Sequence, residues 1–149
     1  MATTARPGVM LSGVAWARQK TVASVGPSIA SIYRRPLRLG KAACIGISQS
    51  GRSPDGVEMM RASGEGGALS IAITNFENSA MAQVSAHCLP LQAGEEKSVA
   101  ATKTFICSVL AGLSLLAEWR QDHALLDALS ALPEALALHG GRSFTLDQP

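Results

Sequence analysis

Small polar residues that could bind a phosphate group are concentrated in one short stretch, Ser48-Gln49-Ser50-Gly51-Arg52-Ser53. The hydroxyls and the carboxamide can donate hydrogen bonds to phosphate oxygens without adding a fixed charge, and Gly51 allows the backbone to approach an anion closely. The stretch is neither a Walker loop nor a GxGxxG fingerprint, which disfavours nucleotide binding. On spacing alone, these residues fit a phosphate-binding loop and an ordinary turn before a helix equally well.

The segments on either side of this stretch predict the elements that would position it. Apolar runs over Lys41–Ser48 and Ala68–Thr74 are typical of buried parallel strands. Between them, Ser53-Pro54-Asp55 begins a helix with a candidate N-cap and a proline at the first helical position, and Gly66-Gly67 ends the segment. In such a βαβ unit, the loop leaving the first strand meets the helix N-terminus and can bind an anion there.

Downstream, the same alternation of strands and helices continues. A short helix near Ala80–Ser85 and a strand at Cys88–Leu91 are expected, and then a long helix from Val99 to about Arg120 with Ser98 as its N-cap. We expect this long helix to turn five apolar residues toward the core: Val99, Phe105, Val109, Leu113 and Leu116.

Both ends of the chain predict additional elements. Upstream, a strand is expected at Thr21–Val25 and a short helix at Pro27–Tyr33. From Asp122 a Leu/Ala-rich helix is expected, interrupted at Pro133 and ended by Gly140-Gly141.

Length and composition fit one globular domain of 149 residues, 47% hydrophobic and only 4% aromatic. The net charge of +2 comes from interspersed acidic and basic residues, so we expect neither nucleic acid nor a membrane as a partner. The longest apolar stretch, Phe105–Ala117, is too short to span a bilayer, which requires about 20 residues. Because Met1–Lys20 lacks an apolar segment with a cleavage site, the expected location is the cytoplasm.

Cysteines and histidines show no spacing typical of a metal, disulfide or triad site. The three cysteines lie far apart among apolar residues and are expected to be buried, reduced thiols: Cys44, Cys88 and Cys107. The three histidines are expected to be structural or exposed: His87, His123 and His139. We therefore expect no metal and no cofactor.

Two motifs, in the correct order, resemble those of one known family. Ile47–Asp55 resembles the Ser-Gln-Ser-Gly motif of sugar isomerase (SIS) domains. Ala93–Phe105 is similar to the Ala-Gly-x-Glu-x-x-Val-Ala-Ser-Thr-Lys-x-Phe motif in the isomerase half of glucosamine-6-phosphate synthases, to which glucosamine-6-phosphate deaminases are related. The resemblance covers about Thr21–Trp119 and implies an α/β, flavodoxin-like fold with three layers and a parallel sheet.

The resemblance also implies a ligand, a ketohexose or aminohexose phosphate such as fructose-6-phosphate or glucosamine-6-phosphate. The residues implied to hold its phosphate are Ser48, Gln49, Ser50, Gly51 and Ser53. Those implied to shape the sugar site are Val99, Ala100, Ala101 and Lys103. Ala101 stands where the family motif has a serine, which calls one hydrogen bond to the sugar into question.

Charged residues within the two motifs leave alternatives open. Glu96 is a weak candidate for a catalytic base, and the better-supported interpretation is a structural ion at a helix start, with Lys103 pairing with Glu95 or Glu96. Arg52 fits a phosphate contact and a solvated side chain equally well.

Compared with the family, the chain is expected to be a partial SIS domain over residues 21–120, with an atypical segment at 1–20 and a linker helix at 121–149. Met1–Lys20 shows no counterpart of the family's first glycine-rich strand, so the sheet is expected to be truncated at its N-terminal strand. The expected function is that of a fragment of an isomerase acting on fructose-6-phosphate or glucosamine-6-phosphate. A non-catalytic sugar-phosphate-binding module and a nonfunctional remnant are the alternatives, and a homodimer is compatible with each.

Overall fold

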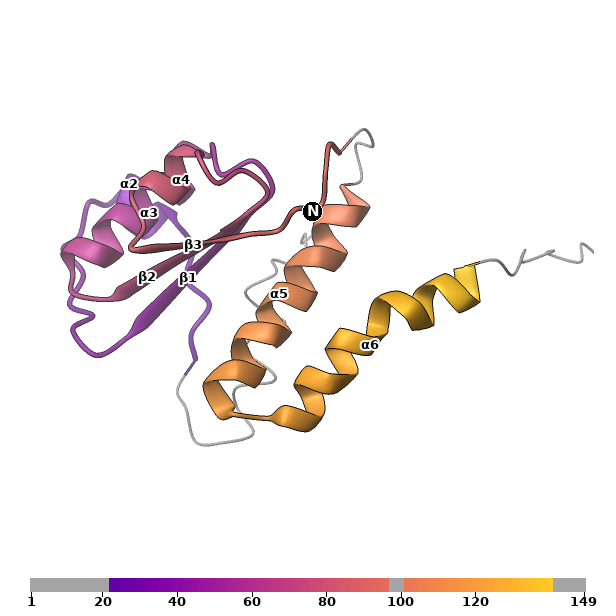
Figure 1. Cartoon of the computed structure of the whole chain (residues 1–149). Helices are drawn as coiled ribbons and strands as arrows, with labels where there is room; N and C mark the ends of the chain where they lie inside the picture. The colour runs from indigo at the N-terminus through magenta and orange to yellow at the C-terminus, as the bar shows by residue number, and fades with distance from the viewer. Residues whose placement is uncertain (1–21, 97–100, 141–149) are drawn as a thin grey trace, which may run out of the picture. The chain divides into compact units, whose positions relative to one another are not determined.

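The computed structural model describes residues 22–96 and 101–140 of the chain (Figure 1). The chain divides into two compact units, Met1–Gly112 and Leu113–Pro149, with the boundary inside one long helix. In chain order the described elements are α2 (Ser28–Ser31), β1 (Ala43–Ser48), α3 (Pro54–Glu65), β2 (Leu69–Thr74), α4 (Ala80–Gln83), β3 (His87–Pro90), α5 (Thr102–Arg120) and α6 (His123–Gly140).

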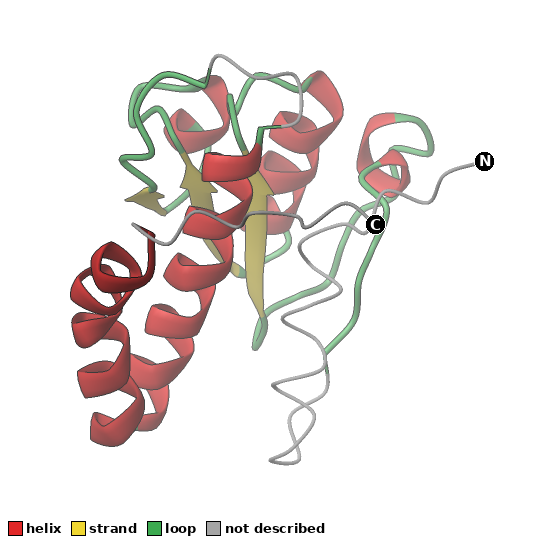
Figure 2. Cartoon of the chain, turned by 90° about the vertical axis from the view of Figure 1, so that its right-hand side faces the viewer, coloured by secondary structure: helices red, strands yellow, loops and turns green. Residues whose placement is uncertain are grey.

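The strands of the first unit form one parallel sheet in the order β1-β2-β3, and they lie side by side in Figure 2. β1 pairs with β2 from Ala43 opposite Leu69 to Ser48 opposite Thr74. β2 is the central strand of the three, and its last five residues are all buried. A strand buried on both faces needs no alternation of polar and apolar residues, which explains the nearly continuous run Leu-Ser-Ile-Ala-Ile-Thr.

Helices α3 and α4 both pack on this sheet and contact each other, so they cover the same face. Met60 of α3, Ala72 of β2 and Met81 of α4 form the buried centre of this layer. Cys44 and Val57 pack against the centre from its margin. The layer therefore fixes the α3 helix relative to the carboxyl ends of β1 and β2, where the serine-rich stretch lies.

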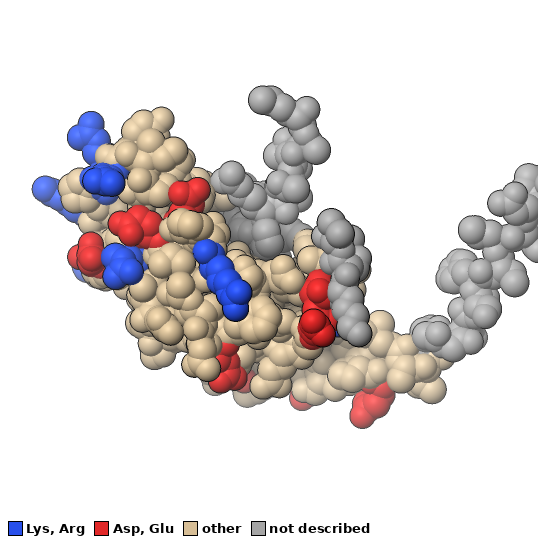
Figure 3. Space-filling view, turned by 90° about the horizontal axis from the view of Figure 1, so that it is seen from above, with Lys and Arg blue, Asp and Glu red and all other residues tan. Residues whose placement is uncertain are grey.

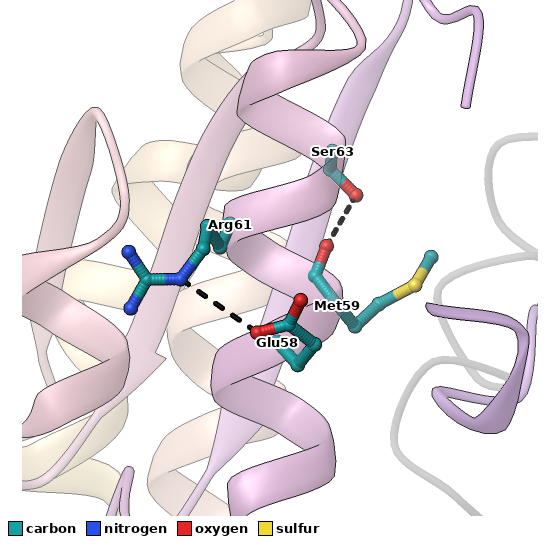
Figure 4. A network of polar contacts seen from close by, with 4 residues as sticks. All are labelled: Glu58, Met59, Arg61 and Ser63. Atoms are coloured by element: carbon teal, nitrogen blue, oxygen red, sulfur yellow. Dashed lines mark hydrogen bonds and ion pairs between the residues drawn. The ribbon is translucent and has the colours of Figure 1, made fainter. Parts of the chain in front are cut away.

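α3 has one face toward solvent and one toward the core (Figure 4). Glu58 and Arg61 form an exposed ion pair at 3.7 Å across one turn, an interaction that contributes little to stability in water. Ser63 is fully buried and donates a hydrogen bond of 2.7 Å to the Met59 carbonyl, so its polar hydroxyl is satisfied within the helix.

Most of the expected elements are present, and the α/β class with a parallel sheet is confirmed. The sequence predicts a strand at Thr21–Val25, and for the described residues 22–25 this prediction is wrong, because they have no regular secondary structure. This segment lacks a paired neighbour, and β-propensity alone does not form a strand. Within the described residues, no helix has the length and hydrophobicity of a membrane span.

The fully buried positions of α5 hold small residues, and the expected core residues Val109, Leu113 and Leu116 are half-buried. Thr104, Ser108 and Gly112, spaced four residues apart on one face, are buried, whereas Phe105 is 45% exposed. The expectation that Phe105 faces the core is therefore wrong for the described chain. The expected core residue Val99 and the expected N-cap Ser98 lie outside the described residues.

α6 runs without interruption through Pro133, so the break expected there is wrong. Proline lacks the N–H that would bond to the Leu129 carbonyl, but its fixed φ is compatible with a helix, so one hydrogen bond is lost without ending the element. The start of α6 is capped by Asp122, whose carboxylate accepts from the Leu125 N–H at 3.2 Å.

Candidate functional site

The serine loop, defined here as Ser48–Ser53, connects the carboxyl end of β1 to the N-terminus of α3. Two hydroxyl oxygens in it accept backbone N–H groups: Ser48 Oγ from Gly51 at 3.1 Å, and Ser50 Oγ from Arg52 at 3.4 Å. These short-range bonds use the acceptor side of each hydroxyl and leave its proton for another partner. The loop can therefore present hydroxyl donors while its own backbone is held.

Three contacts from the end of β2 and from α4 fix the serine loop. The Gln49 carbonyl accepts from the Thr74 hydroxyl at 3.2 Å and from the Asn75 N–H at 3.1 Å, and the Gly51 carbonyl accepts from the Met81 N–H at 2.9 Å. Gly51 has φ of +60°, a conformation that favours glycine, and a Cβ built there would overlap with Ser79. Gly51 is thus required by both the conformation and the space.

The start of α3 offers unsatisfied donors next to the serine loop. Ser53 is the N-cap residue as expected, but its side chain makes no capping hydrogen bond. Pro54 has no N–H to satisfy, and the N–H groups of Asp55 and Gly56 have no partner within the helix because they belong to its first turn. The Ser53 hydroxyl and these two N–H groups are the donors that an anion would find here.

Arg52 is exposed, with its guanidinium 5.9 Å from the centre of the Phe76 ring. Such a contact at a solvent-exposed site is worth roughly 0.5–1 kcal/mol and favours one region of space for the side chain. On the face seen in Figure 3, cationic and anionic side chains are intermixed rather than gathered by sign. Arg52 is thus an exposed cation within the serine loop, beside the Phe76 ring.

The second motif begins with a turn, Ala93–Glu96, called here the 93–96 turn. The Asn75 carboxamide holds it, accepting from the Ala93 N–H at 2.8 Å and donating to the Gly94 carbonyl at 2.7 Å. Thr74 and Asn75 are site residues that neither motif identifies. The available signal is their place, because polar residues at the end of a buried parallel strand lie at the ligand-binding edge of the sheet.

The charged residues of the second motif have structural partners. The Glu96 carboxylate accepts from the Thr104 N–H at 3.1 Å and from its hydroxyl at 3.2 Å, so it satisfies a free donor in the first turn of α5. Lys103 donates to the backbone carbonyl of Glu95 at 2.7 Å rather than to a carboxylate. The catalytic role of Glu96 stays a prediction.

The remaining expected sugar-site residues are only partly visible. Val99 and Ala100 lie outside the described residues. Ala101 has φ of +47°, an unusual value for a residue with a Cβ, and its carbonyl accepts the first helical bond of α5, from Phe105 at 3.0 Å. Strained residues of this kind are frequent at ligand sites, but they also occur at helix starts.

His87 and the three cysteines lie outside both motifs. His87 is the first residue of β3 and therefore lies at the opposite edge from the serine loop. The cysteines are unpaired and partly buried, rather than buried as expected. Burial, and to a smaller extent the nearby Glu77 carboxylate, raises the pKa of the Cys88 thiol, so Cys88 is protonated near neutral pH.

Residues 22–96 and 101–140 contain no cluster of three or more His, Cys, Asp or Glu side chains able to hold a metal ion.

Relatives of known sequence are enzymes much longer than this chain. Glutamine–fructose-6-phosphate aminotransferase (isomerizing) of Sulfolobus acidocaldarius is 37% identical over 65% of this chain and 16% of its own length. The enzyme of the same name from Bartonella quintana is 32% identical over 81% of this chain and 22% of its own length. The chain thus spans about a fifth of the length of these relatives.

Solved structures and a family model agree on the fold. A Silicibacter pomeroyi protein described as a phosphosugar isomerase is 48% identical with a TM-score of 0.87, covering 93% of this chain and 43% of that one. A Clostridium difficile protein at 21% identity and a TM-score of 0.65, covering 89% of this chain and 42% of that one, shows likeness of fold alone. The family model for the SIS domain matches residues 22–117. This chain belongs to the SIS domain family.

Proposed function

We propose that the serine loop binds the phosphate group of a hexose phosphate, with fructose-6-phosphate and glucosamine-6-phosphate as the candidate ligands. The observation that carries this proposal is the unused donor set at the start of α3, where the Ser53 hydroxyl caps nothing. The hydroxyl protons of Ser48 and Ser50 and the dipole of α3 would favour the same anion. The relatives named for fructose-6-phosphate support the choice of sugar.

A binding role without turnover is the form of this function that the described residues support best. Glu96 is engaged by Thr104, and Lys103 by the Glu95 carbonyl, so the two charged residues of the second motif shape the start of α5. Both bonds from Thr104 go to one oxygen of the Glu96 carboxylate, Oε2, and they orient this side chain toward the start of α5. The alternative, that the chain supplies part of an isomerase site completed by other residues, is supported by the names of its relatives.

Calorimetric titration of the purified chain tests the binding proposal. The ligands are fructose-6-phosphate, glucosamine-6-phosphate, inorganic phosphate and unphosphorylated fructose. We expect both hexose phosphates to bind and fructose not to bind, because the phosphate supplies the charge-assisted hydrogen bonds. Absence of hexose phosphate binding, or equal binding of fructose, would remove the serine loop as a phosphate site.

A coupled assay separates the two forms of the function. We expect the chain alone to produce no glucosamine-6-phosphate from fructose-6-phosphate with glutamine or ammonia, and no ammonia from glucosamine-6-phosphate. Turnover that disappears in a Glu96→Gln variant would instead make Glu96 a catalytic base.

Three further expectations stay predictions: a homodimer, a cytoplasmic location, and domain boundaries at about residues 20 and 120. We propose to test the first by light scattering of the purified chain, in which a mass of twice the 15.4 kDa chain supports the dimer. The boundaries can be tested by limited proteolysis, with cleavage expected near the ends of residues 21–120.

A further inference from the structure

Asn75, the residue directly after β2, contacts both motifs at once. Its backbone N–H donates to the Gln49 carbonyl of the serine loop at 3.1 Å. Its side chain bonds to the 93–96 turn through both atoms of the carboxamide, at 2.8 Å to the Ala93 N–H and at 2.7 Å to the Gly94 carbonyl. Two segments more than forty residues apart in the sequence are therefore joined through one residue.

The chemistry of this contact requires an amide. The 93–96 turn presents one N–H and one C=O to the end of β2, and a carboxamide is the small side chain that offers an acceptor and a donor in one plane. An aspartate would keep the acceptor for Ala93 but would place a charged oxygen against the Gly94 carbonyl. Alanine would remove both bonds while keeping the backbone bond to Gln49.

Packing does not replace these bonds at the turn. Gly94 has φ of +68°, and a Cβ built on it would have no atom of the described residues within 4 Å. The other bonds to the turn come from α5: Lys103 donates to the Glu95 carbonyl, and Thr104 donates to the Glu96 carboxylate, so these bonds link the turn to α5 and not to the sheet. The position of the turn relative to the sheet therefore depends on the Asn75 carboxamide.

We propose that Asn75 is a positioning residue that sets the 93–96 turn relative to the serine loop, so that its side chain controls recognition of the sugar and not of the phosphate. This inference rests on the proposed function, because it assigns the phosphate to the serine loop. Its physical basis is the division within one residue: the backbone supports the serine loop and the carboxamide supports the 93–96 turn.

Affinities of Asn75→Ala for two ligands test this division. Two lost neutral hydrogen bonds should weaken fructose-6-phosphate by about tenfold, whereas inorganic phosphate should change by less than about twofold because the serine loop keeps its backbone bonds. Asn78→Ala is the matched control, since Asn78 lies in the same segment, is exposed, and its side chain has no hydrogen bond within the described residues. It should change neither affinity.

Equal losses for the two ligands would overturn the proposal, because they would show that Asn75 supports the phosphate loop or the fold in general. An unchanged affinity for fructose-6-phosphate would overturn it as well. Asn75→Asp keeps one of the two bonds and should recover no more than part of the loss.

Hydrogen exchange separates failure of this inference from failure of the proposed function, because it needs no ligand. In Asn75→Ala the Ala93 amide should lose protection, while the amides of the serine loop keep theirs. Unchanged protection at Ala93 would overturn the positioning role even if hexose phosphate binds. Lost protection in a chain that binds no hexose phosphate would reject the proposed ligand and the control of its recognition, and would leave Asn75 only as the residue that holds the turn.

Discussion

The serine loop and the 93–96 turn each contain a glycine in the left-handed region, and the two glycines differ in what surrounds them. Gly51 has φ of +60° and no room for a Cβ, which would overlap with Ser79 and lie 3.0 Å from the Thr74 hydroxyl. Gly94 has φ of +68°, and no atom of the described residues lies within 4 Å of the same position. The serine loop is thus held by close packing as well as by hydrogen bonds, whereas the 93–96 turn is held by hydrogen bonds from the side chains of Asn75, Lys103 and Thr104.

This difference matters for recognition because a phosphate group is the same in every hexose phosphate, whereas the sugar varies. A loop fixed by close contacts suits a constant group, since little order has to be gained on binding. A turn whose contacts are mainly side-chain hydrogen bonds, those of Asn75 among them, can shift by small amounts at low cost. Variation among relatives in ligand preference is therefore expected to come from the 93–96 turn.

Replacement of the two glycines by alanine should give the largest contrast. Gly51→Ala combines left-handed strain, roughly 1–2 kcal/mol, with overpacking of typically about 1–3 kcal/mol, so the free energy of unfolding should fall by about 3 to 4 kcal/mol. Gly94→Ala carries the strain alone and should cost about 1 kcal/mol. Urea unfolding measures both, and equal losses would show that the serine loop is not the more tightly packed region.

The hydroxyls of the serine loop should account for the next largest effect, on affinity. Each charge-assisted hydrogen bond is worth roughly 1.5–3 kcal/mol, so Ser50→Ala combined with Ser53→Ala should weaken binding of a hexose phosphate by about 3 kcal/mol. The two ligands used for Asn75 should now lose affinity together. Ser130→Ala, an exposed serine of α6 that donates only to the Leu126 carbonyl, is the control. Unchanged affinity in the double variant would place the phosphate elsewhere.

How well the sequence predicts each of these two regions depends on how far apart the contacting residues lie along the chain. The serine loop is predicted because strand, loop and helix follow one another, and the cap at Ser53 and the proline at Pro54 are visible within three residues. Its support from Thr74 comes from 25 residues away, and the Asn75 contact with Gly94 spans 19. No local pattern in one sequence shows which polar residue at a strand end reaches which turn.

The wrong expectations have the same origin. The apolar period of α5 predicts Phe105 in the core, yet the buried positions of that helix are the small residues Thr104, Ser108, Gly112 and Ala117. Close approach between elements selects small side chains, and a hydrophobic pattern does not report it. A proline usually kinks or ends a helix. At Pro133 the helix continues, so the remaining residues of α6 tolerate the loss of one backbone hydrogen bond.

The smallest expected effect distinguishes the structural role of Glu96 from a chemical one. Its carboxylate accepts from the Thr104 N–H and hydroxyl in the first turn of α5, where a negative charge also interacts favourably with the helix dipole. Glu96→Gln keeps an acceptor oxygen and removes only the charge, so stability should fall by about 0.5 kcal/mol, and by less at high salt. Glu96→Ala removes the acceptor too and should cost about 1 kcal/mol, the usual loss for a helix cap. Urea unfolding at two salt concentrations measures this order. If Glu96→Gln leaves stability unchanged but alters the handling of fructose-6-phosphate, the carboxylate serves the ligand, and the 93–96 turn carries chemistry as well as shape.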